Sequence, residues 1–322
     1  MGEQPAGGSP IRIGASACLL GERVRWDGGH KRDRFVTEML GPFVEFVRVC
    51  PEQESGLPTP RPTLRLSGDP EDPRLVFVQS GEDYTETMLA HARARVRELE
   101  QQNLCGFVLK SESPSCGMER VRVYSAKGMP AKKGVGLFAR ELMRRLPLLP
   151  VEEEGRLNDP KLRETFVERI FAYRRWLDFL ADDFSPARLV DFHRVHKYLL
   201  LAHSPEHYSS MGRLVASRKQ LGRAELRERY GLELMQAMAR PATRGRHHNV
   251  LQHMAGYFKR DLDDASRTEL HGTLEDYRKS LVPLVVPLTL LRHHVRALDV
   301  AYLADQVYLA PHPKELMLRN HV

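Results

Sequence analysis

Residues 104–117 read LCGFVLKSESPSCG, an apolar run followed by a loop of serine, proline and glycine that carries a cysteine. The apolar run is typical of a buried strand, and residues 84–102 before it have the apolar spacing of an amphipathic helix. Further strands are expected at 11–17 (IRIGASA) and 44–49. Strands that alternate with helices predict an α/β domain with a mainly parallel, Rossmann-like sheet.

The remaining pattern separates the chain into two parts. In the first part we also expect strands at 75–79 and from residue 148 (LLPV), and helices at 34–46 and 135–146. After the acidic turn at 152–155 the pattern becomes helical, with expected helices at 162–180, 186–201, 224–239, 249–259, 265–279 and 287–303. The sequence therefore predicts an α/β domain over 1–154 and an all-α domain over 155–322.

Charge follows the same division. Residues 1–154 hold 22 Lys+Arg against 22 Asp+Glu, whereas residues 155–322 hold 27 against 20, which accounts for the whole net charge of +7. Of the 14 histidines, 12 lie in the second part. A basic domain favours a polyanionic partner such as nucleic acid, and a merely soluble basic surface is the alternative.

The cellular setting bears on how the cysteines are used. No apolar run approaches the roughly 20 residues that span a bilayer, and the first ten residues lack a signal-peptide core. We therefore expect a cytoplasmic protein without a membrane partner. Thiols stay reduced in the cytoplasm, which favours metal binding or catalysis over disulfides.

Three of the four cysteines follow predicted strands. Cys18 comes after the strand at 11–17, Cys50 after the strand at 44–49 and Cys116 after the strand at 104–110. Because the carboxyl ends of parallel strands face one crevice, these thiols are expected to converge there. Cys105 sits at the amino end of its strand and is expected to be a buried structural thiol.

The three thiols alone leave several kinds of site open. A cubane iron–sulfur cluster held by three thiolates keeps one iron open for substrate. Zinc usually takes four ligands and often uses C-x-x-C pairs, which this sequence lacks. The other interpretations are a redox dithiol, a cysteine nucleophile and thiols that simply pack in the core.

Four sequence blocks narrow this choice. SACLLG at 16–21, RWDGGHKRD at 25–33, CPEQESGLPTPR at 50–61 and KSESPSCG at 110–117 resemble, in order, the signature blocks of the thiouracil desulfidase (TudS-type) family. The second part, with HRVHKYLLLAHSPEHYSSMGRLVA from His193 and NVLQHMAGYFKR from Asn249, resembles the helical domain fused to, or encoded near, such modules. The whole arrangement resembles enzymes that remove sulfur from 2-thiouridine in RNA.

The resemblance implies a [4Fe-4S] cluster held by Cys18, Cys50 and Cys116, and a non-redox desulfuration of thiolated uridine in tRNA to uridine plus sulfide. In that reaction water attacks the carbon of the C=S group while iron polarises the sulfur. The family pattern also calls for a carboxylate base and a hydroxyl. Glu52 is the first choice for the base, with Glu54 left open, and Ser113 is the choice for the hydroxyl.

Two nearby residues are given supporting roles. Asp27, in a Gly-rich turn, would orient the loop that carries Cys18. Arg61 would contact a phosphate or the base, and a plain surface role is the alternative. In the second part, Pro205 between His203 and His207 should break the helix, so phosphate contacts or core hydrogen bonds are favoured over a histidine metal site there.

The basic second part is expected to grip RNA and present a base to the cluster. Cationic side chains would hold phosphates and an aromatic ring would stack on a base. The residues expected to contact RNA are Arg213, Arg218, Lys219, Arg223, Arg244, Arg246, His247, Tyr257 and Lys259.

Two further functions fit the same residues. One is a desulfidase of free thiouracil whose helical domain serves dimerisation, so that the protein is a homodimer. The other is a zinc- or thiol-containing RNA-binding adaptor without catalysis. The sequence leaves open whether position 2 or position 4 of the ring is desulfurised.

Overall fold

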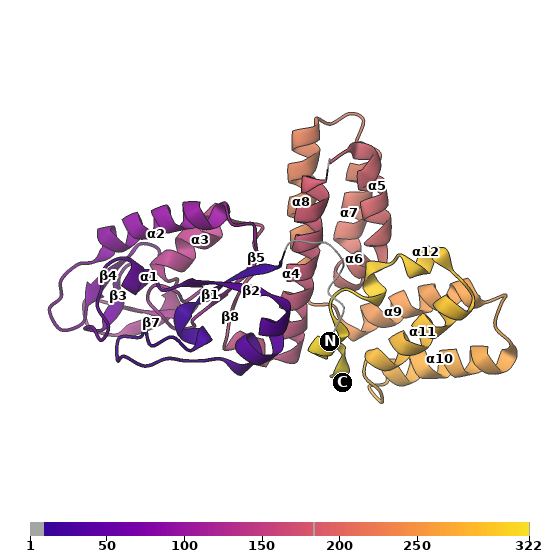
Figure 1. Cartoon of the computed structure of the whole chain (residues 1–322), viewed down its shortest axis with the longest axis horizontal. Helices are drawn as coiled ribbons and strands as arrows, with labels where there is room; N and C mark the ends of the chain where they lie inside the picture. Colours follow the sequence, from indigo (N-terminus) through magenta and orange to yellow (C-terminus); the bar gives the residue numbers. More distant parts are fainter. Residues whose placement is uncertain (1–9, 183, 322) are drawn as a thin grey trace. The chain divides into compact units, whose positions relative to one another are not determined.

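The structure, a computed structural model, describes residues 10–182 and 184–321. The chain divides into two compact units between Asp159 and Pro160. The first unit is α/β and the second is helical, which confirms the predicted fold class (Figure 1). The boundary inferred from sequence falls after Glu154, but the short 3-10 helix η4 (Arg156–Asn158) still contacts the last strand of the α/β unit.

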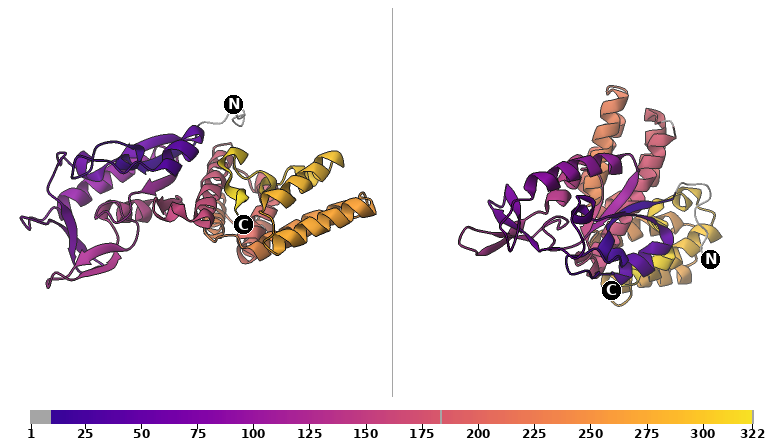
Figure 2. Two further views of the ribbon diagram at one scale, coloured as in Figure 1. Left: turned by 90° about the horizontal axis from the view of Figure 1, so that it is seen from below. Right: turned by 60° about the vertical axis from the view of Figure 1, so that its left-hand side comes forward.

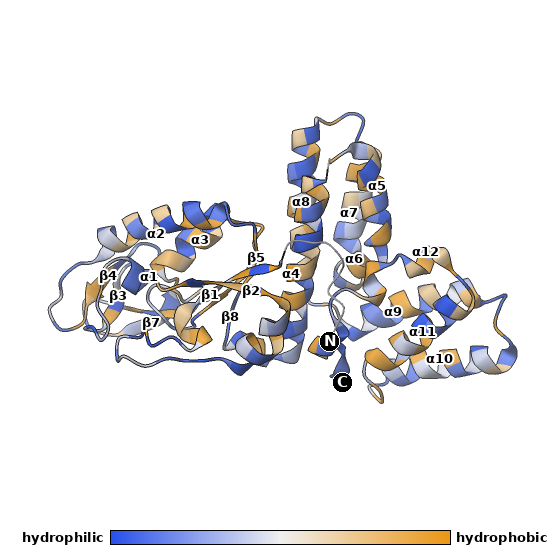
Figure 3. Cartoon of the chain, in the orientation of Figure 1, coloured by the Kyte–Doolittle hydropathy of each residue, from blue (hydrophilic) through white to orange (hydrophobic). Residues whose placement is uncertain are grey.

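The main sheet of the α/β unit is entirely parallel. Its strands run in the order β2 (Glu45–Val49), β1 (Arg12–Ser16), β5 (Leu104–Leu109) and β8 (Val151–Glu153). All residues of β5 are buried, as expected for a central parallel strand, and β1 and β5 show hydrophobic colours in Figure 3. Gly14 is needed in β1, because a Cβ atom there would lie 2.1 Å from the Phe107 ring of β5.

A second, mixed sheet was only partly foreseen. Its strands run in the order β4 (Pro73–Phe77), β3 (Leu64–Gly68), β6 (Val121–Tyr124) and β7 (Pro130–Gly134). The strand expected at 75–79 is β4, and it pairs antiparallel with β3 instead of joining the parallel sheet. Strands β3, β6 and β7 were not predicted, because they are short and β7, which reads PAKKG, has little apolar character.

Two helices lie side by side in this unit. They are α2 (Thr85–Glu100) and α3 (Leu137–Arg145), which contact each other along their length (Figures 1 and 2). Met88 and Leu89 of α2 and Leu137 of α3 pack with Leu66 and Val123 of the mixed sheet. The helix expected at 34–46 is instead a π-helix over Phe35–Leu40 followed by a 3-10 turn over Gly41–Phe43.

The second unit contains a series of helices. They are α4 (Pro160–Ala181), α5 (Pro186–Val195), α6 (Lys197–His203), α7 (Pro205–Ala216), α8 (Arg223–Met238), α9 (Arg244–Ala255), α10 (Asp264–Arg278), α11 (Val285–Ala297) and α12 (Ala301–Ala304). The helices expected at 186–201 and 287–303 are each divided in two, and α7 was not predicted. Within the described residues, no helix is long and apolar enough to cross a membrane.

Pro205 acts as the sequence predicts. It occupies the first turn of α7, where its missing N–H costs nothing, and Ser204 caps the helix by accepting a hydrogen bond from the His207 N–H. His203 ends α6 and His207 begins α7, so the two histidines lie on different helices.

Candidate functional site

The structure brings three cysteines to one cavity. Cys18 lies in the 3-10 turn η1 (Ala17–Leu20) after β1, Cys50 lies between β2 and the short helix α1 (Pro51–Glu54), and Cys116 lies in the loop after β5. All three side chains are buried and line the same cavity of about 520 Å³. Cys105 is buried inside β5, away from this lining.

Hydrogen bonds from the following loop fix the turn that holds Cys18. The Cys18 carbonyl accepts a hydrogen bond from the Lys31 N–H at 2.9 Å. Asp27 shapes that loop, because its Oδ1 accepts from the Gly29 N–H at 3.0 Å and pairs with Arg25 at 3.3 Å. Asp27 therefore orders the segment that in turn braces Cys18.

The loop that carries Cys116 is shaped by a serine. The Oγ atom of Ser113 accepts hydrogen bonds from the Cys116 N–H at 3.1 Å and from the Ser115 N–H at 3.3 Å. The start of α3 presses against this loop, since a Cβ atom on Gly136 would lie 2.4 Å from the Ser115 carbonyl oxygen. Ser113 lines the cavity, and its hydroxyl lies 3.3 Å from the Ser115 hydroxyl. Because Ser115 donates its one hydrogen to Glu52, Ser113 is the donor in this contact.

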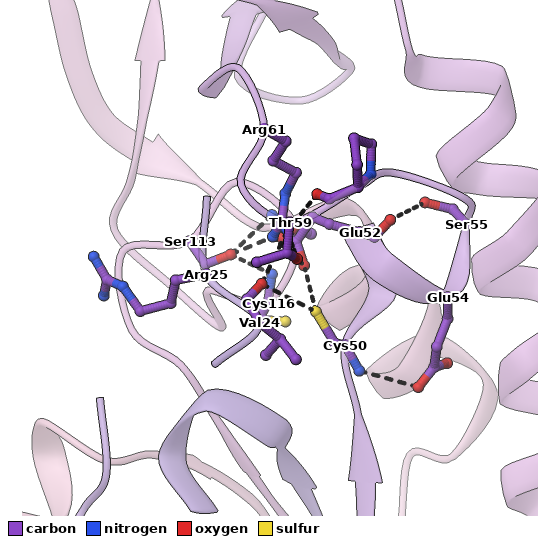
Figure 4. A network of polar contacts seen from close by, with 12 residues as sticks. Val24, Arg25, Cys50, Glu52, Glu54, Ser55, Thr59, Arg61, Ser113 and Cys116 are labelled. Atoms are coloured by element: carbon purple, nitrogen blue, oxygen red, sulfur yellow. Dashed lines mark hydrogen bonds and ion pairs between the residues drawn. The ribbon is translucent and has the colours of Figure 1, made fainter. Parts of the chain in front are cut away.

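Glu52 faces the thiols. Its Oε2 atom lies 3.6 Å from the Sγ atom of Cys50 and 3.9 Å from Nη2 of Arg61, and its Oε1 atom accepts a hydrogen bond from the Ser115 hydroxyl (Figure 4). Arg61 is anchored by a 2.9 Å hydrogen bond from Nη1 to the Val24 carbonyl, and only 5% of its side chain is exposed. A plain surface role for Arg61 is therefore excluded.

Glu54, the other carboxylate considered for the base, serves a different purpose. Its Oε1 atom accepts the Cys50 N–H at 3.0 Å, and its Oε2 atom lies 3.0 Å from Nε of Arg95 and 3.5 Å from Nε2 of His91. Figure 4 shows its carboxylate at the backbone amide of Cys50, away from Cys116. The cavity lining includes Glu52 and leaves out Glu54.

Ser115 is the site residue that sequence reasoning missed. It is fully buried, and its hydroxyl donates to Glu52 from a loop 63 positions further along the chain. Its place inside the SPSCG block, between Ser113 and Cys116, is the only sign of this role in the sequence.

The thiols are shielded from water, and a carboxylate lies beside them. Burial, followed by the charge of Glu52, raises the pKa of Cys18 to about 11 and that of Cys50 to about 12. The same causes raise the pKa of Cys116 well above its ordinary value. Without a metal the three groups are protonated at neutral pH, and a bound cation would be needed to hold them as thiolates.

The donor set fits a cluster. Within the described residues, no three His, Cys, Asp or Glu side chains are grouped around a point in the way a single metal ion needs. In an iron–sulfur cluster each thiolate binds its own iron, so the ligands need not meet at one point. Three buried thiols on the wall of a cavity of about 520 Å³ meet that demand.

The residues expected to contact RNA have mixed surroundings. Arg213, Lys219, Tyr257 and Lys259 are exposed. The others donate to or bond with protein groups: Arg218 with the Val215 carbonyl, Arg223 with Phe184, Arg244 with Tyr277, Arg246 with His203 and His247 with the Tyr308 hydroxyl. His247 is buried in the helical unit, so an RNA contact at this residue stays a prediction that its surroundings do not support.

The helical unit matches proteins without an assigned function. Residues 197–313 match a family described as a protein of unknown function (DUF1722). The protein YbgA of Escherichia coli (strain K12), which is described as uncharacterized, is 28% identical over 165 residues, or 51% of this chain and 98% of YbgA.

The α/β unit matches a family that is described by a sulfur reaction. Residues 13–154 match the family described as 2-thiouracil desulfurase. The uncharacterized protein YbbK of Bacillus subtilis (strain 168) is 32% identical over 107 residues, or 32% of this chain and 70% of YbbK. A solved structure named [4Fe-4S]-dependent thiouracil desulfidase TudS is 31% identical, with a TM-score of 0.38, over 46% of this chain and 94% of the other. Through residues 13–154, the chain belongs to the 2-thiouracil desulfurase family.

Proposed function

We propose that the protein replaces the sulfur of a thiolated uracil ring with oxygen from water, and that Cys18, Cys50 and Cys116 hold a [4Fe-4S] cluster for this purpose. The observation that carries the proposal is the cavity these buried thiols share with the carboxylate of Glu52. The family match of residues 13–154 supports the substrate class. The name of the solved relative, to which the chain is 31% identical, supports the kind of cluster.

The reaction is balanced without any oxidant or reductant. One C=S double bond breaks and one C=O double bond forms, while water supplies the oxygen and its two hydrogens leave with the sulfur as hydrogen sulfide. A [4Fe-4S] cluster with one iron free of protein ligands would supply a Lewis acid for the thiocarbonyl sulfur. The thiocarbonyl group is thus hydrolysed and no net electron transfer occurs.

The protein's own groups would manage the proton and the water. The Glu52 carboxylate, facing the cavity, would take a proton from the attacking water as general base. Ser115 and Arg61 would hold that carboxylate in place from two sides. The hydroxyl of Ser113 would extend this support, because at the cavity wall it contacts the Ser115 hydroxyl that donates to Glu52.

The substrate in this proposal is 2-thiouridine within tRNA. The exposed cations Arg213, Lys219 and Lys259 of the helical unit would bind phosphates, and the exposed ring of Tyr257 would stack on a base. The second candidate is free 2-thiouracil, with the helical unit serving dimerisation. The family description, which refers to the free base, favours this alternative.

The test uses the full chain, reconstituted anaerobically with iron and sulfide and assayed on 2-thiouracil and on thiolated tRNA. A triple variant, Arg213→Glu with Lys219→Glu and Lys259→Glu, is compared with a charge-matched control in the other unit, Arg122→Glu with Lys127→Glu and Lys133→Glu. All six positions are exposed. We expect a brown protein that absorbs at ~400 nm. In the first variant we expect turnover of thiolated tRNA to be at least tenfold slower, while turnover of 2-thiouracil is unchanged.

The outcomes separate the candidates. Equal turnover of tRNA by both triple variants would contradict an RNA role for these side chains while leaving the chemistry intact. Turnover of 2-thiouracil but not of thiolated tRNA would favour the free base. A colourless protein with stoichiometric zinc and no product would contradict the whole proposal.

A further inference from the structure

A second cavity, of about 210 Å³, lies within the helical unit. Its wall is formed by α4, the end of α6, the start of α9, Tyr277 of α10 and residues 319–321. The wall is unusually rich in buried ionisable side chains: Glu164, Glu168, His203, His247 and Arg319. Such groups are costly to remove from water, so their partners and open positions indicate what the cavity is built to hold.

Glu168 is fully engaged. Its Oε1 atom accepts a hydrogen bond from Nη2 of Arg319 at 2.7 Å, and its Oε2 atom lies 2.7 Å from Nε2 of His203. The other ring nitrogen of His203 lies 2.7 Å from the carbonyl oxygen of Arg240. Arg319 also donates from Nη1 to the Tyr308 carbonyl at 2.7 Å. These bonds fix the floor of the cavity.

Two buried atoms in the same wall are left incomplete. Nε of Arg319 and Oε1 of Glu164 make no hydrogen bond within the described residues, and the two atoms form only a long ion pair of 3.5 Å with each other. Arg319 is only 5% exposed, so water does not freely replace the missing partner. A buried polar atom without a hydrogen bond is destabilising, and a ligand oxygen at Nε would supply the missing bond.

The electrostatic balance of the wall is positive. Arg319, Arg244 and Lys161 line the cavity, against the ionised carboxylate of Glu168. Burial first, and then the charge of Glu168, raise the pKa of Glu164 to about 8, so that Glu164 is mostly uncharged at neutral pH. The cationic side chains therefore outnumber the anionic ones around the cavity.

The start of α9 adds to this potential. Residues 241–244 and His247 belong to the wall, and Thr243 caps the helix by accepting a hydrogen bond from the Arg246 N–H at 3.3 Å. The N–H groups of a first helical turn carry partial positive charge and favour oxyanions. The Nε atom of Arg319 and the start of α9 therefore border the same cavity, and both favour a negatively charged ligand there.

We propose that this cavity binds a small oxyanion of the phosphate type, as a free ion or as the phosphate group of a small molecule. The inference goes beyond the proposed desulfuration, since every residue of the site lies in the helical unit and none holds or faces the cysteines. More than one cation lines the wall, which favours a doubly charged tetrahedral group over a single carboxylate.

The test measures binding to the full chain by isothermal titration calorimetry at pH 7 and constant ionic strength. Sulfate is the first probe, because it mimics phosphate and does not titrate near neutral pH, and acetate and uridine 5′-monophosphate are the others. Lys161→Glu alters an exposed residue at the cavity, and Lys279→Glu is the matched control on an exposed site outside it.

We expect saturable binding of one sulfate per chain, weakened about tenfold or more by Lys161→Glu and unchanged by Lys279→Glu. Tighter binding of uridine 5′-monophosphate than of sulfate would assign the site to a phosphorylated small molecule. Equal binding of the two probes would assign it to the free ion. Absence of saturable heat, equal weakening by both variants, or binding of acetate in preference to sulfate would overturn the proposal. Unfolding midpoints without sulfate verify that both variants are folded.

Discussion

Arg61 holds Glu52 against the wall of the cysteine cavity: its Nη2 atom lies 3.9 Å from Oε2 of Glu52, and both side chains are largely buried. The guanidinium is itself fixed by its 2.9 Å hydrogen bond to the Val24 carbonyl. Since Cys50 is separated from Glu52 by one residue, this contact also ties the carboxylate to a proposed cluster ligand. The geometry of the base thus depends on Arg61.

Arg61→Lys tests this positioning. Lysine keeps the charge but cannot reach the Val24 carbonyl and Glu52 with a planar group, so we expect kcat to fall by roughly 10–100-fold with little change in KM. The absorption of the cluster should be retained. Loss of the absorption together with the activity would instead make Arg61 a structural residue of the cluster site.

The two carboxylates of the Cys-Pro-Glu block can be separated by a matched pair of variants. Glu52→Gln should lower kcat by about 10²–10⁴-fold, because an amide cannot accept the proton of water. Glu54→Gln disturbs the contacts with the Cys50 N–H and Arg95, so it should lower stability by about 1–3 kcal/mol while activity per folded molecule remains. Rate assays and urea unfolding distinguish the two, and the reverse pattern would assign the base to Glu54.

The proposed cluster ligands differ from the fourth cysteine. Serine at Cys18, Cys50 or Cys116 should abolish the absorption near ~400 nm after anaerobic reconstitution. Cys105→Ala should retain it, since Cys105 lies within β5 and outside the cavity. Iron and sulfide analysis of the four variants checks the assignment, which would be contradicted by full iron content in any of the first three.

Glu164 gives the helical unit a pH-dependent stability. Its surroundings include Glu168 on the same helix and Arg319 and His321 of the C-terminal segment, and its pKa is raised from 4.5 to about 8. Between these pH values the folded state holds a proton on Glu164 that the unfolded state has lost, so the contribution of Glu164 to the free energy of unfolding falls as the pH rises.

Glu164→Gln removes this dependence because an amide does not ionise. We expect the free energy of unfolding of the variant, relative to that of the wild type, to increase steadily from pH 5 to pH 8. Urea unfolding followed by the fluorescence of buried Trp176, in a Trp26→Phe background, reports on the helical unit. Parallel stability profiles for the wild type and the Glu164→Gln variant would show that the raised pKa is absent.

Much of the fold could be predicted from local sequence patterns. The central strand β5 is a continuous apolar run, β1 is a short segment of mostly small and apolar residues, and α2 has regular apolar spacing, so each was found close to its true bounds. Most of the mixed sheet was missed: β4 was predicted, but the pairing of β3 with β6, which joins the two hairpins, links residues distant in sequence. Pairing between distant residues, such as Leu66 with Val123, stabilises these strands, and a local sequence pattern does not reveal it.

The site could be predicted in part for a related reason. Strand ends and sequence blocks indicated the three cysteines and Glu52. The sequence put Glu52 first but could not exclude Glu54, because the two residues lie in one short helix and only the structure shows which of them faces the thiols. Ser115 was missed because its partner lies 63 positions away in the sequence.

The most direct test of the central claim is the source of the oxygen in the product. The anaerobically reconstituted full chain is incubated with 2-thiouracil in ¹⁸O-labelled water, without oxidant or reductant, and uracil and sulfide are quantified by mass spectrometry and a colorimetric assay. We expect uracil with one solvent-derived oxygen and an equal amount of sulfide. Unlabelled uracil, or no uracil from a protein that carries its full complement of iron, would contradict hydrolysis at this site.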